Sequence, residues 1–241
     1  MVIYNLPKVE SRVRFPLPAH VNPCCLIRDL SYVHMLIAPI IAIVGAPRTG
    51  KSYLAKKLSE QYNATLFLED DGVGYPQRMQ ENLAQNIRPL ERQLWFRTRC
   101  TNRHIEAKIL QQQGKASVLD IFWLSAHLYI DALLQGFERE LMQDISKQDE
   151  HMLGYPDVVI YLKQSEEGTK DFVQQGGRTF DTSDTYYREV IMPAQQSHES
   201  YFNEHGHKMN LITFDRTGVD FGNVDTFQSL VTRIDVSLLR T

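Results

Sequence analysis

The segment Gly45-Ala46-Pro47-Arg48-Thr49-Gly50-Lys51-Ser52 decides the fold class that the sequence predicts. It fits the phosphate-binding pattern G-x-x-x-x-G-K-[ST] at every required position. The apolar run 40–44 before it predicts a buried strand, and residues 52–58 after it have the pattern of an amphipathic helix. This strand, loop and helix are the context that the motif requires. We therefore expect the chain to bind a nucleoside triphosphate.

The residue types of the loop have separate chemical reasons. Gly45 and Gly50 let the backbone turn tightly, so that successive N–H groups can point at phosphate oxygens. The helix that follows adds the positive end of its dipole. We expect Lys51 to bridge the β and γ phosphates and the Ser52 hydroxyl to ligate Mg²⁺. All eight residues of the segment are expected to contact the nucleotide: Gly45, Ala46, Pro47, Arg48, Thr49, Gly50, Lys51 and Ser52.

Composition narrows the class of protein further. The 241 residues suffice for one large α/β domain, and 43% hydrophobic with 23% charged residues is ordinary for a globular protein. The net charge of −3 gives no reason to expect nucleic acid as a partner. Adjacent Cys24 and Cys25 match no metal-ligand spacing, and the run 36–44 is much shorter than the roughly 18 residues of a membrane span. We expect a cytoplasmic protein that does not bind membranes.

The order of predicted elements indicates the architecture. Residues 1–35 contain four of the ten prolines and no sustained period, so we expect an extended arm before a phosphate-loop domain at 36–241. In that domain, predicted strands and helices alternate without hairpin signals, which favours a three-layer α/β fold with a five-stranded parallel sheet, helices on both faces and a short lid. The expected strands are 40–44, 64–69, 116–120, 157–162 and 209–214. The expected helices are 52–58, 76–85, 90–110, 125–146, one from 165, 184–205 and one capped by Asp225 through 239.

Two acids follow predicted strands at the edge where parallel sheets bind ligands. Glu69 ends the second strand, and we favour a functional role for it over Asp70 and Asp71, which have the pattern of a loop or helix cap. Asp120 ends the third strand. In phosphate-loop proteins an acid at this point commonly holds the Mg²⁺ shell, so Ser52 and Asp120 are the expected metal residues.

The predicted helix 90–110 offers a binding face. Leu90 and Leu94 would follow one side of it. The adjoining side carries an aromatic ring beside polar groups: Trp95, Arg99, Asn102 and Arg103. Such a face suits stacking and hydrogen bonding to a base. A core aromatic beside a solvated arginine stripe would give the same pattern, and both interpretations stay open for Trp95.

Together these features resemble the deoxynucleoside kinase family, which includes bacterial deoxyadenosine and deoxyguanosine kinases, over roughly residues 38 to 215. No Asn-Lys-x-Asp motif for guanine is present, and little length remains for an additional ATPase lid domain. The matching motifs are the phosphate loop, Phe67-Leu68-Glu69, Gln93-Leu94-Trp95-Phe96 with Arg99 at a spacing one residue short, Tyr155-Pro156-Asp157-Val158-Val159-Ile160-Tyr161-Leu162, Gly177-Arg178-Thr179-Phe180 in a lid, and the helix from Tyr186-Tyr187 to Tyr201-Phe202.

The resemblance implies an enzyme that transfers the γ-phosphate of ATP to the 5′-hydroxyl of a nucleoside, with Mg²⁺ as cofactor and a homodimer as assembly. It makes Glu69 the general base, with Lys51 and the lid residue Arg178 stabilising the transferred phosphoryl group. The expected substrate-binding residues are Gln93, Trp95, Phe96, Arg99 and Arg103.

The sequence departs from the family after the third strand, where Ile121 replaces an arginine that helps to organise the site. Two alternatives stay open for this reason. The chain could bind nucleotide with weak or no catalysis, or it could phosphorylate a nucleoside monophosphate, whose extra charge Arg97, Arg99 and Arg103 could bind.

Overall fold

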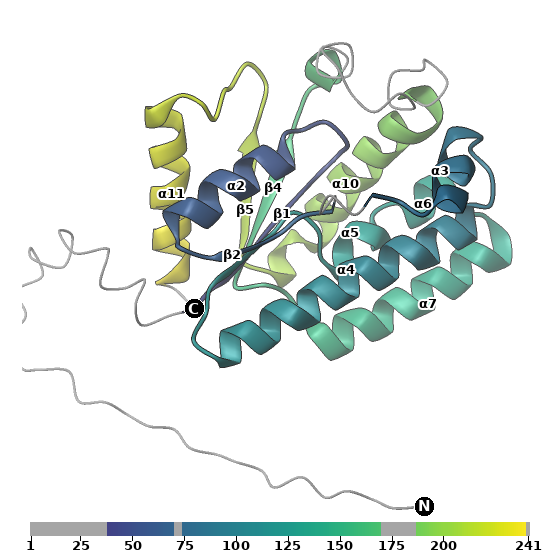
Figure 1. Ribbon diagram of the computed structural model, residues 1–241. Helices are drawn as coiled ribbons and strands as arrows, with labels where there is room; N and C mark the ends of the chain where they lie inside the picture. The colour runs from purple at the N-terminus through teal and green to yellow at the C-terminus, as the bar shows by residue number, and fades with distance from the viewer. Residues whose placement is uncertain (1–37, 70–73, 170–186, 240–241) are drawn as a thin grey trace, which may run out of the picture.

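A computed structural model describes residues 38–69, 74–169 and 187–239 (Figure 1). In these residues five parallel strands form one sheet in the order β2-β3-β1-β4-β5. The strands are β1 (Ile40–Gly45), β2 (Thr65–Phe67), β3 (Ser117–Leu119), β4 (Val158–Lys163) and β5 (Leu211–Asp215). This sheet, with helices on both faces, confirms the predicted three-layer fold.

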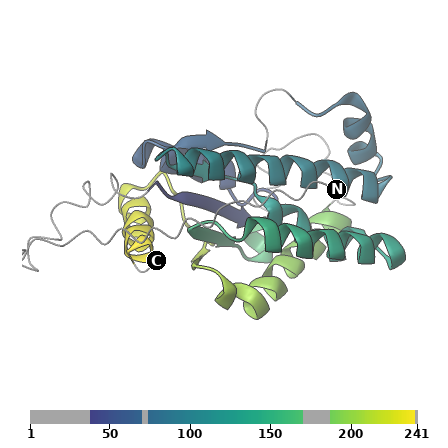
Figure 2. The ribbon, with the colours of Figure 1, turned by 90° about the horizontal axis from the view of Figure 1, so that it is seen from below.

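The helices divide between the two faces of the sheet (Figures 1 and 2). Helices α2 (Lys51–Gln61) and α11 (Val224–Leu238) cover one face, while α4 (Pro89–Gln112), α5 (Trp123–His127) and α10 (Met192–His205) pack on the other. Helix α7 (Gly136–Leu153) lies beside α4 and α5. Further helices are α3 (Gln77–Ala84), α6 (Ile130–Leu133), the π-helix η1 (Tyr187–Ile191) and the 3₁₀ helix η2 (Gly206–Lys208), and residues 166–169 are also helical.

Strand β1 is central because all six of its residues are apolar or glycine and all are buried. Ile41 and Ile43 face the layer of α2 and α11, whereas Ile40, Ala42 and Val44 face the layer of α4 and α10. Burial on both faces is typical of a central parallel strand. The phosphate loop therefore leaves the sheet from its central, fully buried strand.

The predicted helix 125–146 is wrong, because the structure has three shorter helices there. Helix α6 ends at Leu133, the backbone of Leu134 after it is extended, and Gly136 at φ 51° starts α7 in a new direction. Glycine tolerates this left-handed conformation without the steric cost of a side chain. The turn lets α7 pack beside α4.

Three predicted boundaries also change. Asn223, not Asp225, caps α11, because its side chain accepts a hydrogen bond from the Thr226 N–H at 3.1 Å. Pro193 cannot donate a helical hydrogen bond, and the chain before α10 is wound as the π-helix η1. Ser165 precedes the helix that begins at 166, and its Oγ accepts from the Gly168 N–H at 3.1 Å.

Several predictions concern residues outside the described part of the chain. These are the arm at 1–35, Asp70 and Asp71, and the lid with Arg178. Within residues 38–69, 74–169 and 187–239, every helix is too short or too polar to cross a membrane.

Candidate nucleotide and acceptor site

The phosphate loop follows β1, whose neighbours β3 and β4 lie on opposite sides of it. The chain runs from β1 out to β2, returns through β3, and then crosses β1 to β4. In open parallel sheets a ligand binds at the carboxyl ends of the strands where the order reverses in this way. The topology therefore places the sequence motif at the position where a ligand is expected.

Glycines and one lysine determine the shape of the loop. Gly50 has φ 85°, and a Cβ on Gly45 would lie 2.8 Å from the carbonyl oxygen of Leu162. The Lys51 ammonium donates to the carbonyls of Gly45 and Ala46, each at 3.0 Å. Lys51 therefore lies inside the curve of the loop, where the oxygens of a phosphate would be bound.

Arg216 contacts the phosphate loop from the protein interior, and no sequence pattern pointed to this residue. It follows β5 and is 5% exposed. Its Nε donates to the Thr49 carbonyl at 3.2 Å, and its guanidinium carbon lies 4.5 Å from the Phe221 ring centroid. Burial lowers the pKa of its guanidinium from the ordinary value. Because Thr49 is 167 residues away in the chain, only the fold brings the two together.

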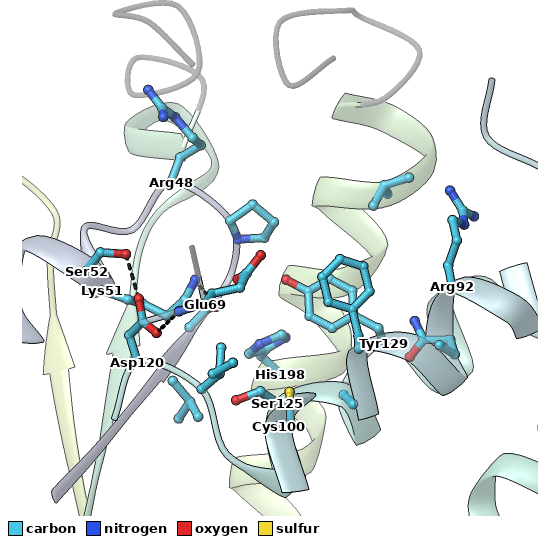
Figure 3. Close-up of a pocket in the computed structure, with 18 of the residues that line it drawn as sticks. Arg48, Lys51, Ser52, Glu69, Arg92, Cys100, Asp120, Ser125, Tyr129 and His198 are labelled. Atoms are coloured by element: carbon cyan, nitrogen blue, oxygen red, sulfur yellow. Dashed lines mark hydrogen bonds between the residues drawn. The ribbon is translucent and has the colours of Figure 1, made fainter. Parts of the chain in front are cut away.

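The two expected metal residues are in contact. The Ser52 hydroxyl donates to Asp120 Oδ2 at 2.7 Å, and the Glu69 N–H donates to Asp120 Oδ1 at 2.6 Å (Figure 3). Burial raises the pKa of Asp120 to about 6, and the Ser52 hydroxyl opposes this rise. The charge of Glu69 raises it further.

The donor set fits Mg²⁺ better than a metal held by protein alone. The described residues contain no group of three or more His, Cys, Asp or Glu side chains arranged for a metal ion. Mg²⁺ typically takes one or two protein oxygens and completes its shell with phosphates and water. The hydroxyl of Ser52 and the carboxylate of Asp120, next to the phosphate loop, match that pattern.

A cavity of about 440 Å³ extends from the phosphate loop to helices α4, α6 and α10 (Figure 3). Its lining includes many of the expected site residues: Gly45, Pro47, Arg48, Gly50, Lys51, Ser52, Glu69, Gln93, Phe96 and Asp120. The structure thus brings the phosphate loop, the acid after β2 and one face of α4 to the same space.

Gln93 occupies the part of the cavity wall that α4 forms. It is 3% exposed, and its side-chain oxygen has no hydrogen-bond partner among the described residues. Phe96 lies one turn along the same helix, and Leu83 and Leu133 add apolar surface. A buried amide in an apolar wall can both donate and accept, so it suits the polar edge of a planar ring.

His198 is a cavity residue that sequence reasoning missed. It lies on α10, is 2% exposed and lines the cavity near Ser125 and Tyr129 (Figure 3). Its Nδ1 is 2.6 Å from the Ala194 carbonyl. Because a carbonyl only accepts, Nδ1 carries the hydrogen, and burial lowers the pKa of the ring to about 4. At neutral pH the ring is therefore uncharged, with its acceptor lone pair on Nε2.

Trp95, Arg99 and Arg103 do not line this cavity, and their role in substrate binding stays a prediction. Residues 93, 96 and 100 of α4 face the cavity, and the 100° step of the helix turns Trp95 and Arg99 toward the chain near Glu69. Arg99 donates to the Glu69 carbonyl at 2.6 Å. Arg103 pairs with Glu106 at 3.1 Å.

Two further residues of the sequence alternatives have other contacts. Arg97 binds Asp149 of α7 through two guanidinium nitrogens, with Nε at 2.7 Å. Ile121 is 3% exposed and packs with Cys100 and Ala126, so it forms an apolar part of the cavity wall.

A glycine loop after a central parallel strand, with a lysine and a hydroxyl–carboxylate pair beside it, defines a P-loop nucleotide-binding protein. The sequence matches the family described as an AAA domain over residues 40–208, and the chain belongs to this family. No curated protein matches the sequence.

Solved structures share the fold. A deoxyadenosine kinase from M. mycoides with dCMP and dCDP is 15% identical at a TM-score of 0.66, with 82% of this chain and 99% of that chain covered. The same enzyme with bound dATP is 15% identical at a TM-score of 0.64, with 80% of this chain and 99% of that chain covered. Thymidylate kinase from Candida albicans is 19% identical at a TM-score of 0.62, with 84% of this chain and 94% of that chain covered. The predicted likeness to deoxynucleoside kinases is thereby confirmed at the level of the fold.

Proposed function

We propose that the chain is an ATP-dependent kinase that transfers the γ-phosphate to the 5′-hydroxyl of a nucleoside or deoxynucleoside. One observation carries this proposal: the Glu69 carboxylate lines the same cavity as the phosphate loop, and the cavity continues to the buried amide of Gln93. A base, a phosphate site and a polar contact for the acceptor therefore share one space. The structural neighbours are named as kinases of a deoxynucleoside and of a nucleotide, which agrees with this reaction.

The described residues divide the chemistry between them. Lys51, inside the loop, offsets negative charge on the transferred group, and Glu69 accepts the proton of the attacking hydroxyl. Ser52 and Asp120 would hold Mg²⁺, which supplies positive charge to the phosphates when bound. We assign Arg178 to the lid as the further cation that the sequence predicts.

The side chains at the end of the cavity away from the phosphate loop suit an uncharged acceptor. Neutral His198 offers an acceptor for a sugar hydroxyl, and Gln93 with Phe96 offers an amide and a ring for a base. The volume of about 440 Å³ falls in the range of small-molecule sites. Trp95 and Arg99 would act on this acceptor only indirectly.

A nucleoside monophosphate is a second candidate acceptor, because Arg92 also lines the cavity. Arg92 is buried and donates to the Asn86 side chain at 2.9 Å. Arg97 and Arg103, which the sequence suggested for this role, are instead paired with acids. A monophosphate would therefore depend on Arg92 and on the loop residue Arg48.

A substrate panel tests the proposal. ADP formation is measured with nucleosides and nucleoside monophosphates, together with ATP affinity by calorimetry. Glu69→Gln should lower kcat about 10²-fold or more while ATP affinity stays unchanged. Lys51→Ala should weaken ATP binding with the fold intact. A wild-type chain that binds ATP but phosphorylates nothing would contradict the proposal, and preference for a monophosphate would favour the second candidate.

We also propose that the chain forms a homodimer through α4 and α7, which lie side by side (Figures 1 and 2). Each helix has exposed apolar side chains: Leu94, Ile105 and Ile109 on α4, and Phe137, Leu141 and Met152 on α7. Such a surface can bury itself against a second copy about a two-fold axis. Ile105→Glu with Ile109→Glu should halve the mass measured by light scattering, and a wild-type monomer would contradict the proposal. Separately, we propose the cytoplasmic location that the composition predicts.

A further inference from the structure

Three elements hold Glu69 through contacts of 2.6 Å. Its N–H donates to Asp120 Oδ1, and its carbonyl accepts from the Arg99 guanidinium. Its Oε1 accepts from the Tyr75 hydroxyl. The first contact places Glu69 against β3, the second against α4 and the third against the segment before α3. Both the backbone and the carboxylate of Glu69 are therefore fixed.

Trp95 supports both of the side chains that donate to Glu69. The Tyr75 ring meets the Trp95 ring edge to face, with centroids 5.2 Å apart. The guanidinium carbon of Arg99 lies 5.0 Å from the centroid of the same indole. Arginine over an indole face is attracted by the ring quadrupole, and edge-to-face rings are likewise favourable. Trp95 therefore fixes Arg99 relative to Tyr75 without lining the cavity.

Tyr75 is itself anchored. Its carbonyl accepts from the Gln80 side chain at 2.7 Å, and Pro76 after it caps α3. Its ring also lies 5.8 Å from that of Phe96, which lines the cavity. The hydroxyl therefore reaches Glu69 from a fixed backbone position.

We propose that Tyr75, Arg99 and Trp95 form a clamp that aims the Glu69 carboxylate at the acceptor hydroxyl. This inference rests on the proposed function, in which Glu69 is the base. Tyr75 fixes the rotation of the carboxylate by holding one of its oxygens, and Arg99 fixes the backbone turn from which the side chain projects. A catalytic base that is oriented by a third group is a recurring arrangement in enzymes. The three residues are positioning residues, because they act through Glu69.

The clamp explains how the site could be organised with an apolar residue after Asp120. Ile121 packs against Cys100 and Ala126 and supplies no charge. The cation that contacts the Glu69 turn comes instead from α4, as Arg99. Because the contact is to a backbone carbonyl, it positions the turn from which the Glu69 side chain projects.

Kinetics of matched variants test the clamp. Tyr75→Phe and Arg99→Met should each lower kcat about 10-fold or more, with ATP affinity within about twofold of wild type, because misplacing a catalytic group costs rate. Arg99→Lys should recover part of the loss, since it restores a donor. Tyr62→Phe is the control: it also removes a hydroxyl bonded to a carboxylate, that of Asp235 at 2.8 Å, but lies between α2 and α11. It should lower Tm and leave kcat unchanged.

A double-mutant cycle separates positioning from stability. In the Glu69→Gln background, Tyr75→Phe should have no further effect on kcat, because its action passes through the carboxylate. Independent, additive losses would overturn the clamp, as would wild-type kcat in both Tyr75→Phe and Arg99→Met. A wild-type chain that binds ATP without phosphorylating any acceptor would instead overturn the proposed function and the clamp with it.

Discussion

Replacing Gly45 with alanine tests whether the phosphate loop needs its observed conformation. Gly45 is the last residue of β1 and pairs with Leu162 of β4. An added Cβ would lie 2.8 Å from the Leu162 carbonyl oxygen and 2.8 Å from Thr49 Oγ1. Neither neighbour moves easily, because one belongs to the sheet and the other bonds to the Ala46 carbonyl at 2.9 Å. Overpacking of this kind costs about 1–3 kcal/mol.

Two other glycines separate crowding from backbone strain. Gly114 has φ 74°, and an added Cβ there would have no atom of the described residues within 4 Å, so alanine adds only the cost of a left-handed residue, about 1–2 kcal/mol. Gly50 has φ 85°, and a Cβ would lie 3.2 Å from Nη2 of Arg216, whose Nε donates to the Thr49 carbonyl. Gly114 follows α4, away from the loop, whereas Gly45 and Gly50 flank it.

Urea unfolding measures the stability of Gly45→Ala, Gly50→Ala and Gly114→Ala, and calorimetry measures their affinity for ATP. All three should lose stability, but only Gly45→Ala and Gly50→Ala should weaken ATP binding. For Gly45→Ala we expect the Kd for ATP to rise about tenfold or more. A tenfold rise corresponds to about 1.4 kcal/mol, which would be the part of the overpacking cost that the ATP-bound loop carries. If Gly45→Ala binds ATP as wild type does, or if Gly114→Ala weakens binding equally, the reasoning from the loop geometry is refuted.

Two further predictions concern buried polar groups. Burial lowers the pKa of His104 to about 4 from 6.5, so the folded state binds fewer protons than the unfolded state between these values. The free energy of unfolding should therefore fall as the pH drops from 6.5 to 4, by up to about 3 kcal/mol from this group, and urea titrations should show a smaller fall for His104→Leu. Gln93→Leu should raise KM for the acceptor about tenfold while ATP affinity stays unchanged, and an unchanged KM would remove Gln93 from the acceptor site.

The nucleotide end of the site was predictable because its information is local. The loop motif spans eight consecutive residues, and the buried strand before it and the helix after it are visible in the same window. The contact between Ser52 and Asp120 also follows from topology, since the ends of β1 and β3 are adjacent in a parallel sheet. The motif and the strand order together are enough to predict how the phosphate loop, Ser52 and Asp120 are arranged.

The proposed acceptor end was less predictable because polar residues form its buried face. Leu94 suggested the inner side of α4, yet it is 38% exposed, while Arg92 and Gln93 are 3% exposed. A hydrophobic stripe cannot reveal a helix face on which an amide and a guanidinium are buried. His198 gave no signal either, because its role depends on a bond to its own helix and on which elements surround it.

The charge of the cavity lining bears on how the proposed ATP and Mg²⁺ would bind. The charged side chains among its described lining are three cations and two carboxylates: Arg48, Lys51, Arg92, Glu69 and Asp120. This near balance offsets little of the charge of a triphosphate, and apolar Ile121 adds none. Mg²⁺ should therefore strengthen binding, and it would also favour ionised Asp120 over the protonated form that burial promotes. We expect removal of Mg²⁺ by a chelator to weaken ATP binding about tenfold or more, and Asp120→Asn to reduce this dependence, both measurable by calorimetry. Equal affinities with and without Mg²⁺ would mean that cations outside the described lining balance the phosphates instead.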